Sequence, residues 1–188
     1  MKIYLEEKIG MPELFTGRSK ELKSLLQWAE NIKRKASKST AILSRRKTGK
    51  SALLQRLFNI IFHKNDGLIP FYYEIGEYPQ WIIPFVKDFF LSFISQYIAF
   101  KTRKTEYLRD SIEDFDLART LVQKYKMNYF LRTIDSIENY TIKEDYESAW
   151  RIARNAPRTI AALKNERIIQ IIDEFQYMET VKPKPTLC

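Results

Sequence analysis

Cysteine and histidine are nearly absent from this sequence of 188 residues, in which Cys188 is the only cysteine and His63 the only histidine. An internal disulfide, a thiolate metal cage and a histidine metal site within one chain are therefore excluded. The first residues, Met1 to Lys8, also lack an apolar core of signal-peptide length. We accordingly expect a protein of the reducing cytoplasm.

Long hydrophobic runs are scarce as well. The most apolar stretch, 81–100, approaches membrane-spanning length, but Pro84, Lys87, Asp88 and Gln96 interrupt it. We therefore predict a buried helix there and no contact with a membrane. The composition, with 45% hydrophobic and 14% aromatic residues, is that of a folded protein, and the length suits one domain.

Acidic residues are outnumbered by basic ones, which gives a formal net charge of +9 at pH 7. Much of the excess lies in one part of the sequence, at Lys33, Arg34, Lys35, Lys38, Arg45, Arg46, Lys47 and Lys50. Such a cluster can bind an anionic partner such as DNA, or it can be the solvated end of a helix that runs into a loop. No aromatic stacking pattern accompanies the cluster, which favours the second interpretation.

Apolar periodicity divides the chain into helices and strands. Helical spacing predicts one helix over 17–35 and another that begins at Gly49, whereas short apolar and aromatic runs predict strands over 39–43, 68–75 and 167–172. The order strand, helix, strand favours a parallel sheet. Residues 77–166 have a helical pattern and form a predicted helical insertion, and residues 181–188 are predicted to be a disordered tail.

The segment between the first predicted strand and the next helix has the composition of a phosphate-binding loop. It consists of Ser44, Arg45, Arg46, Lys47, Thr48, Gly49, Lys50 and Ser51. A loop that ends in Gly-Lys-Ser and opens a helix presents backbone N–H groups and the positive end of the helix to phosphate oxygens. We expect the amides of 47–51 to line the phosphates, Lys50 to reach the β- and γ-phosphates, and Ser51 to bind Mg²⁺.

Two acids close the last predicted strand, which is continuously apolar over 168–172 apart from Gln170 and is expected to be covered on both faces. Asp173 and Glu174 would then lie at the carboxyl edge of the sheet, where parallel sheets usually bind ligands. We expect Asp173 to hold Mg²⁺ through a water molecule, and Glu174 to orient or deprotonate the attacking water. With Lys50 as the other catalytic residue, these acids predict binding of Mg-ATP and its hydrolysis.

Three segments of the chain resemble one family: 15–22, which contains Phe15 and Gly17, the loop 45–51, and 171–177. From about residue 13 to 177 the chain resembles the archaeal and bacterial AAA-related P-loop ATPases, including their signal-transducing, STAND-like branch. The resemblance implies a three-layer α/β fold with 45–51 as the Walker A loop and 171–177 as the Walker B motif. It also implies that Leu14, Phe15 and Gly17 lie against the adenine, although Phe15 alone is equally typical of a hydrophobic staple for the helix that follows.

The sequence departs from this family in two ways. The family's loop usually opens with Gly, and Ser44 at that place predicts weaker nucleotide binding if the position needs a positive φ. The resemblance also ends near Tyr177, before the family's later strands, one of which lies between the first and third strands. We therefore expect one incomplete domain over 1–188, truncated after the Walker B strand, in which a gap separates Lys50 from Asp173 or the flanking strands pair directly. Its open strand edges would favour self-association or aggregation.

Two further functions stay open at this point. One is a fragment that hydrolyses nothing and binds a protein partner through its helical insertion or its sheet edge. The other is a basic DNA-binding protein, whose affinity for DNA would fall steeply with salt. The choice of ATP over GTP depends on the resemblance alone, because the sequence contains no visible guanine-reading motif.

Overall fold

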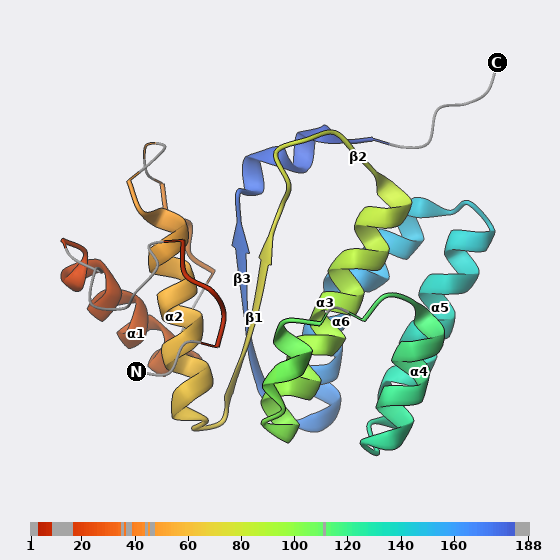
Figure 1. Ribbon diagram of the computed structural model, residues 1–188, viewed down its shortest axis with the longest axis horizontal. Helices are drawn as coiled ribbons and strands as arrows, with labels where there is room; N and C mark the ends of the chain where they lie inside the picture. The colour runs from red at the N-terminus through yellow and green to blue at the C-terminus, as the bar shows by residue number, and fades with distance from the viewer. Residues whose placement is uncertain are drawn as a thin grey trace.

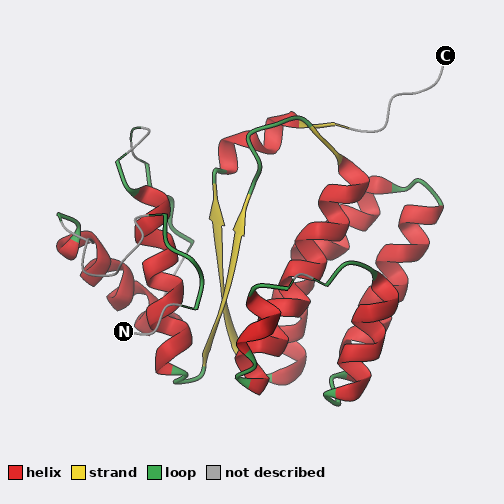
Figure 2. Cartoon of the chain, in the orientation of Figure 1, coloured by secondary structure: helices red, strands yellow, loops and turns green. Residues whose placement is uncertain are grey.

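The computed structural model describes residues 4–8, 17–34, 36, 39–43, 45, 48–110 and 112–182. The longer helices are α1 (Ser19–Lys33), α2 (Lys50–Lys64), α3 (Ile82–Thr102), α4 (Phe115–Lys124), α5 (Leu131–Ile142) and α6 (Tyr146–Lys164). The strands are β1 (Leu68–Glu74), β2 (Gln80–Trp81), β3 (Arg167–Asp173) and β4 (Val181–Lys182). Short 3₁₀ helices are η2 (Thr105–Leu108), η3 (Asn128–Phe130) and η4 (Phe175–Thr180). Helices predominate over strands (Figure 2).

The main sheet consists of two parallel strands, β1 and β3, whose register runs from Leu68 opposite Arg167 to Glu74 opposite Asp173. A second parallel pair, β2 with β4, follows at the carboxyl ends of these strands. Helices α1 and α2 lie on one side of the main sheet and α3 and α6 on the other, with α4 and α5 farther out (Figure 1). The predicted mixed α/β class and the parallel sheet are therefore confirmed.

Local sequence signals explain where α2 and β1 begin and end. Gly49, with a φ of 77°, is the residue before α2, and this left-handed conformation suits glycine. At the other end Asn65 adopts φ 50°, and its N–H bonds to the Ile61 carbonyl, which closes the helix. Gly67, at φ 93°, turns the chain into β1. Every residue of β1 except Glu74 is buried, because helices cover both faces of this strand.

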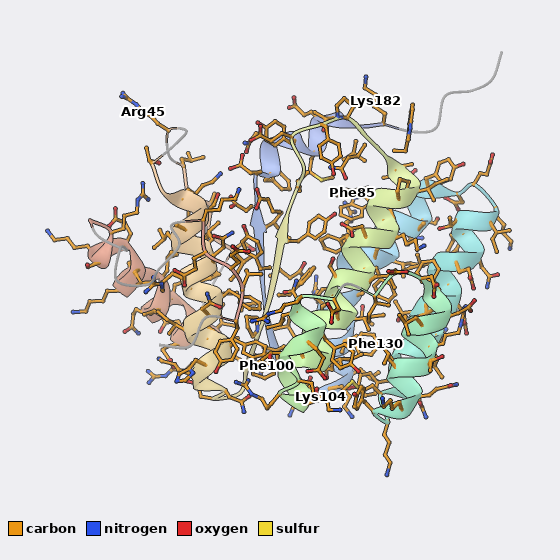
Figure 3. All side chains as sticks on the ribbon, viewed as in Figure 1. Arg45, Phe85, Phe100, Lys104, Phe130 and Lys182 are labelled. Atoms are coloured by element: carbon orange, nitrogen blue, oxygen red, sulfur yellow. The ribbon has the colours of Figure 1, made fainter. Side chains whose placement is uncertain are left out.

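An aromatic core joins β1 to α3. The Phe71 ring lies 5.2 Å from that of Phe89 and 5.3 Å from that of Phe93, and Phe93 in turn lies 5.8 Å from Phe130. Figure 3 labels three aromatic residues of the core, Phe85, Phe100 and Phe130. Helix α3 is long and apolar enough to cross a membrane, but 61% of its most apolar stretch is buried inside the protein. The prediction of a buried helix at 81–100 is thus confirmed, with the helix beginning at Ile82.

The prediction of a strand over 39–43 is wrong. These residues form no strand, and no backbone hydrogen bond joins them to another described residue. A strand forms only where a neighbour pairs with it, and the edge of β3 that would be the nearest partner is separated from 39–43 by a cavity. The side chain of Leu43 is accordingly 94% exposed.

Two smaller expectations need correction. β3 is not covered on both faces: Ile169, Ile171 and Asp173 are buried, but Gln170 between them is exposed. Gln170 and Ile172 line a cavity together with 39–43, so this face of β3 is not fully covered. In the predicted disordered tail, Val181 and Lys182 form β4 against Gln80 and Trp81, and the rest of that tail, 183–188, lies outside the described residues.

Candidate functional site

The first turn of α2 lies at the end of the molecule where β1 and β3 finish (Figure 1). Lys50, the first residue of α2, places its Nζ 3.3 Å from Oδ1 of Asp173 and 3.3 Å from Oε1 of Glu174. The side chain of Asp173 is fully buried, and those of Lys50 and Glu174 are mostly buried. The structure thus brings together three of the four residues for which the sequence predicted catalytic or metal-binding roles, and the fourth, Ser51, follows Lys50 in the first turn of α2.

The helix end at this site has donors to offer. The N–H of Leu53 makes the first intrahelical bond, to the Gly49 carbonyl at 3.0 Å, so the N–H groups of 50–52 have no partner within the helix. The N-cap residue, Gly49, has no side chain to cap the helix, and the first turn of α2 contains no acidic residue. These N–H groups and the helix dipole favour an anion. Thr48 precedes them, and its Oγ1 donates to the Arg45 carbonyl at 2.7 Å.

Asp173 is held by several donors in its buried position. The Tyr72 hydroxyl donates to Oδ2 at 3.1 Å, and the N–H of Glu174 donates to Oδ1 at 2.9 Å. Lys50 supplies a positive charge on the Oδ1 side. A buried carboxylate needs such partners, because the desolvation of an unpaired ion in a protein costs on the order of several kcal/mol.

The charges at the site change the pKa of Lys50. Burial acts to lower this pKa, but the negative charges of Asp173 and Glu174 and their hydrogen bonds to the amine act the other way and outweigh burial. The net effect is a raised pKa, so Lys50 stays a cation at neutral pH. A cation at this place is what a phosphate group requires.

Glu174 occupies an unusual backbone conformation. Its φ of 54° and ψ of 35° lie in the left-handed region, which is uncommon for a residue with a side chain. This conformation ends β3 and starts η4, and Gln176 donates a hydrogen bond to the Glu174 side chain. Non-glycine residues with such strain occur preferentially at functional sites.

The N-terminal segment 4–8 packs on α2 beside the site. Asn59 accepts the N–H groups of Tyr4 and Leu5 on its Oδ1, at 3.0 and 2.7 Å. Glu7, whose side chain is fully buried, forms an ion pair with Arg56 at 2.6 Å. The next residue, Lys8, forms an ion pair with Glu74 at the end of β1.

A cavity of about 760 Å³ adjoins the three charged residues. Its walls are formed by Leu25 and Trp28 of α1, Leu54 and Leu57 of α2, the segment 39–43, and residues 170–176. The sequence predicted either a gap that holds Lys50 apart from Asp173 or direct pairing of the flanking strands. Direct pairing is not seen, because 39–43 form no strand and line the cavity together with 170–173. The separation of Lys50 from Asp173 is wrong, because the long lysine side chain reaches the acid from the first turn of α2.

Only some of the remaining predicted nucleotide-binding residues are described by the structure. Phe15, Ser44, Arg46 and Lys47 lie outside the described residues. Arg45 is exposed and points away from the rest of the molecule (Figure 3). Ser51, the predicted Mg²⁺ ligand, is half-buried in the first turn of α2. Gly17, at φ 79°, comes just before α1 and is exposed.

Sequence reasoning missed four residues near the site: Arg18, Tyr72, Glu74 and Lys8. A Cβ placed on Gly49 would lie 4.0 Å from Arg18 Nε, so this arginine is close to the end of the loop. Its position directly after Gly17, in the first of the three family-like segments, was an available signal. No signal existed for the other three, because they reach the site through the register of β1 with β3 and through the packing of 4–8.

The basic cluster is partly neutralised. Of its described members, Lys33 pairs with Glu30 and Asp66, and Lys50 pairs with Asp173 and Glu174. Arg34 and Arg45 are exposed.

Comparisons with protein-family models, with curated proteins and with solved structures found no match. The geometry of the residues must therefore carry the functional inference.

The arrangement suits the binding of a phosphate group together with a hard cation. It offers a cation, helix N–H groups without an intrahelical partner, a buried carboxylate and a second carboxylate that is partly accessible. Carboxylate and phosphate oxygens are the ligands that hard cations prefer.

Proposed function

We propose that this protein binds Mg-ATP at the first turn of α2 and hydrolyses it as a switch module. The observation that carries the proposal is the convergence of Lys50 with Asp173 and Glu174, each at 3.3 Å, from elements far apart in the sequence. Phosphoryl transfer depends mainly on positioning and on neutralising charge, and these residues provide both. The proposal includes a three-layer P-loop domain of the AAA-related, STAND-like class, with 77–166 as its helical insertion and the cytoplasm as its location.

Each residue has a role that follows from its place. The N–H groups at the start of α2 and the Lys50 amine bind the phosphates, for which the amine exchanges its carboxylate partners. Ser51 and Asp173 would hold Mg²⁺, since one offers a hydroxyl beside the phosphate position and the other a buried, oriented carboxylate. The ion supplies charge neutralisation for the phosphate oxygens when it is bound. Arg18 adds a second positive charge near Gly49.

Glu174 is the residue proposed to act on water. Its Oε1 lies beside Lys50 and its Oε2 accepts from Gln176, so the carboxylate is oriented at the mouth of the site rather than buried in the sheet. A carboxylate in this place can orient the attacking water or accept its proton.

Thermal unfolding tests the binding site. Mg-ATP at about 100 times its dissociation constant should stabilise the folded protein by about 2.7 kcal/mol, or roughly 5–10 °C for a chain of this length. Lys50→Ala should abolish this shift, because the amine that contacts the phosphates is lost. Lys64→Ala, at the other end of the same helix, is the matched control and should keep it. An equal shift in the wild type and in Lys50→Ala would rule out the assigned site.

Phosphate release tests the role of Glu174. Glu174→Gln should keep the ATP-dependent thermal shift and lose hydrolysis by at least about 100-fold, because the amide does not accept a proton. Glu179→Gln, an exposed acid in η4, should retain wild-type turnover. Unchanged hydrolysis in Glu174→Gln would leave the protein an ATP-binding module with a different catalytic group.

A protein-interaction module is the second candidate, and the unpaired edge of β3 in the described structure favours it. Such edges associate with other strands. Size-exclusion chromatography separates the two candidates: a monomer that binds ATP argues against the interaction module, whereas concentration-dependent association without nucleotide binding supports it. For the DNA-binding alternative, the ion pairs of Lys33 and Lys50 are unfavourable, and salt-insensitive or absent DNA binding would dismiss it.

A further inference from the structure

We propose that Tyr72 is a positioning residue that orients the Asp173 carboxylate for Mg²⁺. This role rests on the proposed function, since it concerns the same metal-binding acid. Tyr72 belongs to β1, and its hydroxyl donates to Asp173 Oδ2 at 3.1 Å across the β1–β3 pair. The hydrogen-bond partners of its hydroxyl are Asp173, Glu74 and Gln55, so Asp173 is the predicted Mg²⁺ ligand on which it acts.

Tyr72 is placed to donate a hydrogen bond to the aspartate. The residue is 6% exposed, and its hydroxyl lies within hydrogen-bonding distance of Asp173, Glu74 and Gln55. A donor on one carboxylate oxygen limits the rotation of Asp173.

A chain of hydrogen bonds sets the direction of this proton. The N–H of Lys8 donates to Gln55 Oε1 at 2.7 Å, which assigns the amide oxygen of Gln55 to that side. The Gln55 Nε2 group then faces the Tyr72 hydroxyl at 3.4 Å and donates to its oxygen. With its oxygen accepting from Gln55, the hydroxyl directs its own proton toward a carboxylate.

Two carboxylates compete for that proton. Besides Asp173 Oδ2 at 3.1 Å, the Glu74 Oε2 atom lies 3.3 Å from the Tyr72 hydroxyl. Glu74 already has a cationic partner, because Lys8 forms an ion pair with it, and this hydrogen bond is the largest cause of the raised pKa of Lys8. The cationic partner of Asp173, Lys50, approaches the other oxygen, Oδ1, together with the N–H of Glu174, so Tyr72 is the donor to Oδ2, and at the shorter of the two distances.

Removing the hydroxyl should weaken the binding of Mg²⁺ and leave the binding of the nucleotide almost unchanged. Partners that orient a metal-binding carboxylate are typically worth 10–100-fold in metal affinity. Mg²⁺ strengthens ATP binding, and the Mg²⁺ concentration that gives half of this effect should be about 10-fold higher in Tyr72→Phe than in the wild type. ATP binding in EDTA, which depends on Lys50 and the helix N–H groups, should change by less than about 2-fold, within the range of a substitution away from the binding contacts.

Tyr73 supplies a matched control. It is the next residue of β1, it is 7% exposed, and its hydroxyl donates to Asp88 at 2.8 Å on the opposite face of the sheet. Tyr73→Phe makes the same chemical change with similar burial, and it should leave the Mg²⁺ requirement at the wild-type value. Calorimetric titrations of ATP in EDTA and at increasing MgCl₂ measure both quantities for the three proteins.

The outcomes separate this role from the proposed function. Suppose that the wild type binds Mg-ATP but that the Mg²⁺ requirement of Tyr72→Phe is unchanged or no larger than that of Tyr73→Phe. This result overturns the role of Tyr72 and leaves the proposed function intact. A wild type that binds no nucleotide overturns the proposed function and this role with it. If Tyr72→Phe does not fold, Gln55→Met takes its place, since it removes the donor that directs the hydroxyl: a raised Mg²⁺ requirement supports the role, and an unchanged one overturns it.

Discussion

The helices α3 to α6 and the segments around Lys50 are held together by different kinds of contact. On the α3 side of the sheet, aromatic side chains such as Phe90 and Phe93 are almost completely buried. On the α2 side, ion pairs and hydrogen bonds dominate near the sheet edge, as in Glu7 with Arg56 and Lys50 with Asp173, and Leu43 and Phe175 are largely exposed. Apolar burial stabilises both sides, since Phe58 and Phe62 of α2 are also fully buried, but the α2 side adds buried ion pairs and keeps charged groups within reach of a ligand.

The largest expected effect lies in the aromatic half. Phe93 is 1% exposed and its ring contacts those of Phe71, Tyr97 and Phe130. Phe93→Ala should lower the free energy of unfolding by about 3–5 kcal/mol, because it removes buried apolar area and leaves a cavity. Leu43→Ala, at an exposed position, should change the free energy of unfolding by less than about 0.5 kcal/mol. Urea denaturation measures both, and equal losses would contradict the contrast between the two halves.

The next effect concerns the buried ion pair on the α2 side. Glu7→Ala leaves Arg56 as a buried charge without this partner, which should cost about 3 kcal/mol of folding stability. The neighbouring exposed acid provides the control, and Glu6→Ala should stay within about 0.5 kcal/mol of the wild type. Urea midpoints that do not differ between these variants would show that segment 4–8 does not stabilise α2.

The smallest effect is a pH dependence from Lys50. Its pKa is raised in the folded protein, so its ion pairs contribute stability that is fully present below the unfolded lysine pKa of about 10.4. That contribution is lost as the pH rises above this value and through the folded pKa. The stability difference between the wild type and Lys50→Met should therefore be constant between about pH 7 and about pH 10 and shrink above it. Urea denaturation at each pH measures this difference. A difference that grows in alkaline solution would show that the ion pairs do not stabilise the folded protein in this way.

Local signals were enough to predict much of the fold. The helices at 17–35 and after Gly49, and the strands at 68–75 and 167–172, appear as α1, α2, β1 and β3 with boundaries shifted by a few residues. Each has its own periodicity and its own terminating residue, such as Asn65 after α2. These features depend on residues close together in the sequence, so the sequence alone contains them.

The failures came from partners that local patterns do not contain. Residues 39–43 have strand-like composition but no neighbouring strand among the described residues, and Gln170 is exposed because its face of β3 borders a cavity. The two nucleotide-binding patterns predicted that Lys50 and Asp173 serve one site, but the predicted truncation placed a gap between them, and the reach of the lysine side chain to the acid was not foreseen. The link from Lys8 through Gln55 and Tyr72 to Asp173 could not be predicted, since it depends on strand register and on how 4–8 packs.

Calorimetric titration of Mg-ATP into the wild type and into Asp173→Asn tests the central claim most directly. We predict one site per chain in the wild type, with affinity that falls when Mg²⁺ is removed, and a variant in which Mg²⁺ no longer strengthens binding. Absence of binding to the wild type, or an Asp173→Asn variant whose Mg²⁺ dependence equals that of the wild type, would contradict a shared metal and nucleotide site at Lys50 and Asp173.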